Sequence, residues 1–366
     1  MNILVLNWRD VKHSWAGGSE IYILELAKRW VSRGHSVTLF CGQDQEKILK
    51  PFEKISGVNV YRKGSRFTVY FWAAYYYFVK FRKQTDTIVD TENGIPFFTP
   101  LYSLKPKACI VFHVHKNQWF YEFKFPYNII GYLIERVLFP VVYSRTRIVA
   151  ISKTTMEDLV KIGFKPKRIS IIYSGVEKKV ARFPLLKKFS KPTIIYLGRI
   201  KKYKRINLLI KIMPQILKHT PKARLVIAGW GTEAPFIIDS VMKGNTHRHI
   251  DILGPVSEAE KRKLLSKSWL FVNPSIGEGW SIAVIEANLH GTPAVSFRVS
   301  GLSESIQNEK TGFLVQNEKE LVEKINLILS DHKKREDMSI LAKKWAESFS
   351  WDFAADKTLQ LLKKLK

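Results

Sequence analysis

Two glutamates stand eight residues apart in the stretch SIGEGWSIAVIEANLHGTP, residues 275–293. Glu278 lies in a loop flanked by glycine, whereas Glu286 lies among apolar residues at helical spacing. Burying an ionised carboxylate is costly unless the group is paired or hydrogen-bonded. Hydroxyl groups of a bound ribose would donate to Glu286, and a neighbouring Lys or Arg would satisfy it equally well as a structural ion pair. The sequence leaves both interpretations open.

The loop before Glu286 has the composition of an anion site. Glycines let the backbone approach a ligand closely, and Ser281 is placed to cap the helix that follows. The backbone N–H groups of Gly279, Trp280 and Ser281 would then point at whatever lies in front of the helix.

A second group of candidate residues lies in the run LGRIKKYKR. Gly198 and Arg199 end a predicted strand, and Lys204 follows five residues after the arginine. An arginine fork and a lysine point charge together suit a diphosphate. Solvated surface charge is the competing interpretation in a chain this rich in lysine.

Two glycine turns follow other predicted strands. The turn AGWGTE contains Gly229 but lacks the third glycine of a dinucleotide fingerprint, so we exclude NAD binding. The turn AGGSE, with Gly17 and Gly18, opens the first helix, where backbone amides could contact phosphate. It lacks the Lys and Ser/Thr of a P-loop, which excludes ATP hydrolysis through that motif.

His113 and His115 end the predicted strand ACIVFH and share one face of it. Zinc would need further ligands that do not present themselves nearby in the sequence, so we expect no metal. A hydrogen-bonding or proton-handling role fits a histidine at a strand end better. No D-x-D motif occurs, and Asp90-Thr-Glu92 is the nearest approach to one.

The elements that must position these groups repeat a strand-then-helix rhythm twice, which is typical of parallel sheets wrapped by helices. The rhythm stops in a basic, proline-containing stretch and then restarts with TIIYLGR. We predict an N-terminal Rossmann-like domain at 1–178, a linker at 179–192, a C-terminal Rossmann-like domain at 193–345 and a C-terminal helix at 346–366. Ligands of such sheets bind at the carboxyl ends of the strands.

Composition limits the classes of function. The 366 residues are 46% hydrophobic and carry a formal net charge of +28, which attracts polyanions or anionic membranes. The alternative explanation for this charge is a proteome that is generally rich in lysine. Cys41 and Cys109 are the two cysteines, so we expect no disulfide and a reducing cytoplasm. We expect neither a signal peptide nor a segment long enough to span a bilayer.

Two aromatic segments with basic neighbours stand out, at residues 67–81 and 119–143. Docking of these segments on the cytoplasmic face of a membrane is one interpretation. Burial in the core of the first domain is the other.

Taken together, the motifs resemble those of the family 4 retaining glycosyltransferases over nearly the whole chain. The residues that carry the resemblance are the E-x7-E pair Glu278/Glu286, the G-R-x4-K run 198–204, the G-x-G of Gly229/Gly231, AGGSE, SGVE at 174–177 and TGFLV from Thr311. The resemblance implies an α/β fold of the GT-B type: two Rossmann-like domains facing across a cleft, with a final helix crossing back to the first.

The resemblance also implies roles: the domain 1–178 would bind the acceptor, and the domain 193–345 would bind the nucleotide-sugar. Glu286 would hold the ribose, Arg199 and Lys204 the diphosphate, and Glu278 the sugar hydroxyls. The amides of residues 279–281 would lie beside sugar and phosphate, and the loop 17–18 would close over the phosphates. His113, or His115 two residues on, would lie near the reacting centre. No metal or other cofactor is expected.

The expected partners are a nucleotide-sugar donor with UDP or GDP, a glycan or lipid-linked acceptor, and an anionic membrane surface. Two other readings of the sequence are weaker. Scattered basic residues without a binding module argue against nucleic acid, and an epimerase-like activity on the same architecture stays open. The family usually has glycine where Ser281 stands, so this chain places a hydroxyl beside the expected sugar.

Overall fold

The computed structural model describes residues 1–177 and 186–365, which form two compact units. The first unit contains residues 1–175 together with the C-terminal helix from Trp351, and the second runs from Val176 to Ser350. Residues 179–185 of the predicted linker 179–192 lie outside the described residues, and the first strand of the second unit begins at Thr193.

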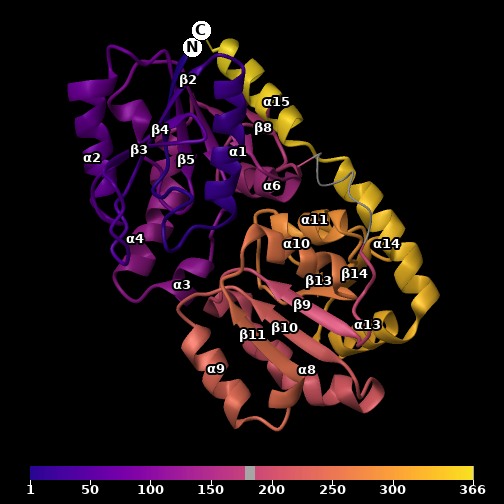
Figure 1. Ribbon diagram of the computed structural model, residues 1–366. Coiled ribbons are helices and arrows are strands. Elements are labelled where there is room, and N and C mark those ends of the chain that lie inside the picture. Colours follow the sequence, from indigo (N-terminus) through magenta and orange to yellow (C-terminus); the bar gives the residue numbers. More distant parts are fainter. Residues whose placement is uncertain (178–185, 366) are drawn as a thin grey trace. The chain divides into compact units, whose positions relative to one another are not determined.

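The first unit is built on an eight-stranded sheet in the order β3-β4-β2-β1-β5-β6-β7-β8 (Figure 1). All neighbouring strands are parallel except the hairpin β3–β4. The strands are β1 (Asn2–Leu6), β2 (Ser36–Cys41), β3 (Phe52–Ile55), β4 (Val58–Arg62), β5 (Thr87–Glu92), β6 (Lys107–Val111), β7 (Arg147–Ala150) and β8 (Ile169–Ile171). The α-helices are α1 (Gly18–Ser32), α2 (Val69–Tyr76), α3 (Gln118–Glu122), α4 (Tyr127–Leu133), α5 (Phe139–Val142), α6 (Lys153–Lys161) and α15 (Trp351–Lys363).

The C-terminal helix α15 packs along α1, and Figure 1 shows the two side by side. The fully buried Trp30 of α1 donates from Nε1 to the carbonyl of Ala355 at 3.0 Å. Arg29 of α1 pairs with Asp352 of α15 at 2.9 Å. The last helix therefore belongs to the first unit although the second unit precedes it in the sequence.

The aromatic segment 67–81 forms α2 and a π-helical turn, Tyr77–Phe81. One side of it packs on the sheet, where Val69, Ala73 and Tyr77 join a core cluster with Leu4 and Leu6 of β1. The other side carries exposed aromatic residues. Burial in the core is therefore confirmed for one face of this segment, and membrane docking of the other face stays a prediction.

The second unit is built on a six-stranded parallel sheet in the order β11-β10-β9-β12-β13-β14. Its strands are β9 (Thr193–Leu197), β10 (Arg224–Ala228), β11 (Ile250–Gly254), β12 (Leu270–Asn273), β13 (Ala294–Phe297) and β14 (Gly312–Val315). Its α-helices are α8 (Ile206–His219), α9 (Ala234–Lys243), α10 (Glu258–Lys267), α11 (Ile282–Leu289), α12 (Leu302–Ser305), α13 (Glu318–Ser330) and α14 (His332–Glu347).

Alternate residues of β9 point to opposite faces of this sheet. Ile194 packs among residues of α8, α9 and α13 in one buried cluster, whereas Ile195 packs with Val284 of α11 and Leu302 of α12 in another. Helices therefore cover both faces, which confirms the predicted doubly wound architecture.

The predicted strands and most predicted helices are confirmed, and both cysteines are buried and free. Among residues 1–177 and 186–365, no helix combines the length and the apolar content needed to cross a membrane.

Candidate functional site

The strand order of the second unit identifies where a ligand would bind. The chain runs from β9 outward to β10 and β11, and then returns to β12 on the other side of β9. Open parallel sheets bind ligands outside the carboxyl ends of the strands at such a switch point. Gly198 and Arg199 directly follow β9, and the loop with Glu278 follows β12. The structure thus brings the two predicted sequence clusters to one edge of the sheet.

Glycines at the ends of β9 and β10 let the two backbones touch. Gly198 donates from N to Ala228 O at 3.0 Å. Gly229 has φ +138°, and a Cβ there would lie 1.9 Å from Gly198 O. A Cβ on Gly231 would lie 2.2 Å from Ile200 O. The G-x-G turn therefore serves close backbone packing at the site.

Glu278 is held in place by several partners on both strand ends. Lys204 forms an ion pair with it, Asn273 Nδ2 donates to it at 3.2 Å, and Ser275 Oγ donates at 2.8 Å. Burial acts to raise the pKa of Glu278, but Lys204 and these hydrogen bonds outweigh it and hold that pKa below its usual value. The carboxylate is ionised and fixed in orientation.

The loop 279–281 differs from the sequence expectation in one respect. Ser281 occupies the N-cap position of α11, but its side chain makes no capping hydrogen bond. Its Oγ instead accepts from Asn273 Nδ2 at 3.3 Å, next to Glu278. The indole ring of Trp280 is buried 5.1 Å from the ring of Phe349. The predicted capping by Ser281 is therefore wrong.

Glu286 lies on α11 and is paired with Lys261 of α10. The distance from Lys261 Nζ to Glu286 Oε1 is 2.8 Å, and Lys261 also contacts Glu258 at 2.9 Å. A quarter of the Glu286 side chain is exposed. Burial raises the pKa of this carboxyl, and Lys261 offsets part of the increase. The structural ion pair that the sequence left open is present, and the exposed part of the carboxylate is still accessible to a ligand.

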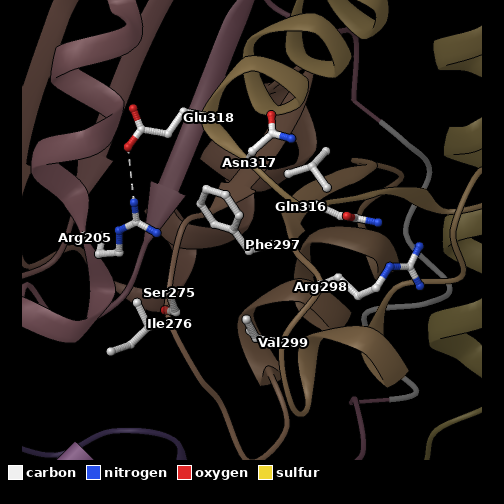
Figure 2. A pocket seen from close by; sticks show the side chains of 10 residues that line it. Arg205, Ser275, Ile276, Phe297, Arg298, Val299, Gln316, Asn317 and Glu318 are labelled. Carbon is white, nitrogen blue, oxygen red and sulfur yellow. Dashed lines mark hydrogen bonds and ion pairs between the residues drawn. The ribbon is translucent and has the colours of Figure 1, made fainter.

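A hollow of about 570 Å³ lies beyond the ends of β13 and β14, and Ser275, a partner of Glu278, is among the residues that line it (Figure 2). Arg205 lies on its wall with the guanidinium 3.4 Å from Glu318, and Phe297 and Arg298 also line it. None of the predicted site residues lines this hollow.

The first unit has its own switch point, between β1 and β5. Gly17 caps α1 there, and its N–H donates to Glu20 Oε2 at 2.7 Å. Glu20 is buried and pairs with Arg9 at 3.1 Å. Asn93, just after β5, donates to Ser19 Oγ at 2.9 Å. The AGGSE turn that contains Gly17 and Gly18 is thus tied to both strand ends.

His113 and His115 follow β6, with their rings 5.1 Å apart. His113 Nε2 contacts Gln118 Oε1 at 2.9 Å. His115 is held by Glu135, which accepts from its backbone N at 2.6 Å and lies 3.3 Å from its Nδ1. Burial acts to lower the pKa of His115, but Glu135 outweighs it and raises that pKa.

Sequence reasoning missed three charged residues of these sites: Lys261, Glu92 and Glu135. Glu92 ends β5 and is buried, and one of its oxygens accepts from Gly94 N at 2.7 Å. Burial, followed by repulsion from Glu135, raises the pKa of Glu92 to about 8. Its position at the end of a strand was a usable signal, whereas the partners Lys261 and Glu135 lie 25 and 20 residues from the groups that they contact.

Two family profiles match this chain. Residues 177–345 match the one described as "Glycosyl transferases group 1", and residues 16–180 match "Glycosyltransferase Family 4". Both halves of the chain match glycosyltransferase families, so the chain is a glycosyltransferase. Together the matches cover both switch points.

Relatives and solved structures agree with this assignment. The chain is 28% identical to an uncharacterized glycosyltransferase, MJ1607, of Methanocaldococcus jannaschii, over 99% of this chain and 98% of the relative. It is 24% identical to the gpi3 subunit of the phosphatidylinositol N-acetylglucosaminyltransferase of Schizosaccharomyces pombe, over 86% of this chain and 70% of the relative.

Two solved structures show the same fold over the whole of this glycosyltransferase. Sucrose-phosphate synthase from Thermosynechococcus elongatus superposes with a TM-score of 0.81 at 19% identity, covering 100% of this chain and 98% of the other. Anabaena Alr3699/HepE in complex with UDP-glucose superposes with a TM-score of 0.77 at 15% identity, covering 100% of both chains. These likenesses establish the predicted GT-B fold with its two Rossmann-like units.

Proposed function

We propose that this glycosyltransferase moves a hexose from a UDP- or GDP-sugar to a hydroxyl group of a lipid-linked or glycan acceptor, with retention of configuration at the sugar. The observation that carries the proposal is the ion pair Lys204–Glu278, which joins the ends of β9 and β12 at the switch point of the second unit. A cation for phosphate and a fixed carboxylate for sugar hydroxyls stand there side by side.

Each group at this edge has a task in the proposal. Glu286, the second glutamate of the E-x7-E motif, accepts hydrogen bonds from the ribose through the exposed part of its carboxylate. Arg199 and Lys204 hold the diphosphate, and Glu278 orients the sugar hydroxyls. The solved structure of Alr3699/HepE in complex with UDP-glucose supports UDP as the first nucleotide to test.

The chemistry needs no metal in this proposal. The bond from the sugar C1 to the diphosphate oxygen breaks, and the electron pair stays on the diphosphate. The acceptor oxygen bonds to C1 on the same face, and its proton passes to the departing diphosphate. Arg199 and Lys204 stabilise the charge that grows on the leaving group. Stabilisation of developing charge by fixed charges is usually the largest single contribution to catalysis.

The first unit presents the surface that we propose for docking on an anionic bilayer. The exposed aromatic residues of α2 and of the segment α3–α4 meet where Phe67 stacks on Tyr127, with 6.0 Å between ring centroids. The exposed apolar residues of these segments include Phe67, Phe71, Tyr75, Phe78, Phe120, Tyr121, Phe125, Tyr127, Ile130 and Leu133.

Basic side chains accompany this aromatic surface. Arg66 lies 4.8 Å from the ring centroid of Phe123, and Lys63 lies 5.0 Å from that of Trp72. Aromatic side chains insert at the level of lipid headgroups while cations bind the phosphates. A cytoplasmic enzyme that docks in this way meets a lipid-linked acceptor at the membrane, and the phosphatidylinositol named in the yeast relative is consistent with this class of acceptor.

The experiment that tests the donor site is a thermal-shift panel of UDP, GDP and ADP with EDTA present. We expect one nucleotide to raise the melting temperature, because at 100 times its dissociation constant a ligand contributes about 2.7 kcal/mol. No shift with any of the three, or a shift that EDTA abolishes, contradicts the proposed metal-free donor site.

A further inference from the structure

We propose that Glu92, His115 and Glu135 bind one divalent transition-metal cation in the first unit. The three side chains offer two carboxylate oxygens and an imidazole nitrogen, and these ligand atoms all lie within 4.8 Å of one another. The inference is independent of the proposed transfer reaction, since none of the three residues holds the donor in it.

The unsatisfied group at this site is the carboxylate of Glu92. The residue is 1% exposed, and Oε2 is buried without a hydrogen-bond partner among residues 1–177 and 186–365. Among the groups that act most strongly on the pKa of Glu92, Glu135 is a second carboxylate and raises it, and His115 lowers it. A buried anion in these surroundings needs a cation.

A proton on Glu92 alone would leave the site unsatisfied. A carboxylic acid O–H is a hydrogen-bond donor, and a buried donor without an acceptor is costly. Glu135 already accepts from the backbone amides of His115 and Lys116. No hydrogen bond joins Glu92 to Glu135 in the described part of the chain. A metal ion would bind both carboxylates at once and satisfy Oε2 without a further acceptor.

The geometry needs only a small closure around the ion. Ligand bonds of about 2.1 Å place two ligands of one ion at most about 4.2 Å apart. The observed upper separation of 4.8 Å is thus larger by about 0.6 Å, which small side-chain rotations can absorb. Glu135 lies in a π-helical turn, Ile134–Leu138, a feature that is frequent at functional sites.

The donor set selects the class of ion. Two carboxylate oxygens with one imidazole nitrogen suit Zn²⁺, Mn²⁺, Fe²⁺ or Co²⁺, whereas Mg²⁺ prefers oxygen ligands and bound water. The ion would connect the end of β5 with the loop after β6 and with Glu135. Since that loop also carries His113, the ion would fix the position of the histidine expected near the acceptor.

The test uses the whole protein after treatment with a chelator and removal of the chelator. Calorimetric titration with Zn²⁺ and with Co²⁺ measures the affinity of the wild type, of Glu92→Gln and of His115→Gln. Glu122→Gln is the matched control, because Glu122 is exposed and lies seven residues after His115. We expect one equivalent of metal to bind tightly to the wild type and to the control. Both site variants should bind the metal at least about 10-fold more weakly.

A second readout locates the ion in the folded wild type. The Trp119 ring lies 5.2 Å from the His115 ring, so Co²⁺ should quench part of the tryptophan fluorescence. That quenching should be missing in Trp119→Phe. Affinities equal in wild type and Glu92→Gln, no bound equivalent in the wild type, or quenching unchanged in Trp119→Phe would each overturn the proposal. If Glu92→Gln does not fold, the fluorescence comparison decides.

Discussion

Lys261 Nζ lies 2.8 Å from Glu286 Oε1, so the carboxylate in the apolar helix α11 has a cationic partner before any ligand arrives. Lys261 is shared with Glu258, which is largely exposed. The pair offsets part of the desolvation cost of Glu286 and holds its carboxylate in position. In the proposed function, a ribose adds hydrogen bonds to this prepared group.

The ion pair Lys204–Glu278 is expected to contribute both to the stability of the fold and to turnover. Lys204→Ala leaves the ionised Glu278 without its cation, so the melting temperature should fall, because breaking a buried pair costs about 3–5 kcal/mol. Turnover should also fall by about 100-fold or more, because the leaving group loses a stabilising charge.

The double variant Lys204→Ala/Glu278→Gln distinguishes the two effects. It should regain most of the melting temperature but no turnover, measured as UDP released from the donor. Lys202→Ala, at an exposed lysine two residues away, should match the wild type in both measurements. Normal turnover in Lys204→Ala would contradict the assigned role.

The close contact between Gly301 and the loop that carries Glu278 allows a steric test of that loop. Gly301 has φ +74°, and a Cβ there would lie 2.3 Å from Glu278 O and 2.7 Å from Gly279 C. Gly301→Ala should therefore lower the melting temperature and weaken nucleotide binding. Gly254 has a similar φ of +68° with nothing within 4 Å of its Cβ position.

Gly254→Ala is thus the matched control for stability, since it bears only the left-handed backbone cost of about 1–2 kcal/mol. Differential scanning fluorimetry compares the two variants. Equal losses of stability would show that the contact with the Glu278 loop is unimportant.

The lowered pKa of Asp44 predicts that the protein loses stability in acid. Burial acts to raise the pKa of Asp44, but hydrogen bonds from the amides of Ser14 and Glu46 outweigh this and lower the pKa to about 2. Because the folded pKa lies below the unfolded value, the stabilisation is present above about pH 4 and is lost as pH falls toward 2.

The size of this contribution is about 2 kcal/mol at neutral pH. Asp44→Asn should flatten the decrease in melting temperature between pH 4 and pH 2, whereas Asp337→Asn, at an exposed aspartate, should leave it as in the wild type. Asp44 accepts a hydrogen bond from Ser14, just before the Gly17 turn. If Asp44→Asn shows the same decrease in melting temperature between pH 4 and pH 2 as the wild type, this loop is held by other contacts.

The proposed membrane surface predicts a selective loss of binding. Phe71 and Phe78 are 79% and 52% exposed, so Phe71→Ser/Phe78→Ser should reduce cosedimentation with vesicles rich in phosphatidylglycerol by about 10-fold or more. Ile340→Ser/Phe353→Ser removes equally exposed apolar residues, 60% and 61%, from α14 and α15 and should bind as the wild type does. Binding that is indifferent to anionic lipid, or equal in both variants, would refute docking through α2.

Much of the fold could be predicted because hydrophobic periodicity and glycine turns are local signals. The strand that ends just before Gly198, the strand that carries Asn273 and the helix that carries Glu286 are of this kind. The hairpin β3–β4 was missed, since the strands FEKI and VNVYR are short and only partly buried, and the helix α9 was missed although its apolar spacing is regular.

The site could be predicted only in part. Residue type and position in the sequence singled out Glu278, Glu286 and Lys204, and the structure places Lys204 and Glu278 in contact. The partners Lys261 and Glu135 could not be found in this way, because contacts between residues 20 or more positions apart depend on helix packing. The capping role expected for Ser281 was wrong because Asn273 competes for its hydroxyl.

The most direct test of the donor site is calorimetric binding of UDP to the wild type, to Glu286→Gln and to Glu258→Gln, all in EDTA. Both glutamates contact Lys261, so each variant removes one carboxylate partner of that lysine, and only Glu286 is proposed to hold the ribose. We predict that Glu286→Gln weakens UDP binding by about 10-fold or more, since a hydrogen bond to a charged group contributes about 1.5–3 kcal/mol, and that Glu258→Gln binds as the wild type does. Equal affinity for UDP in all three proteins would contradict the account.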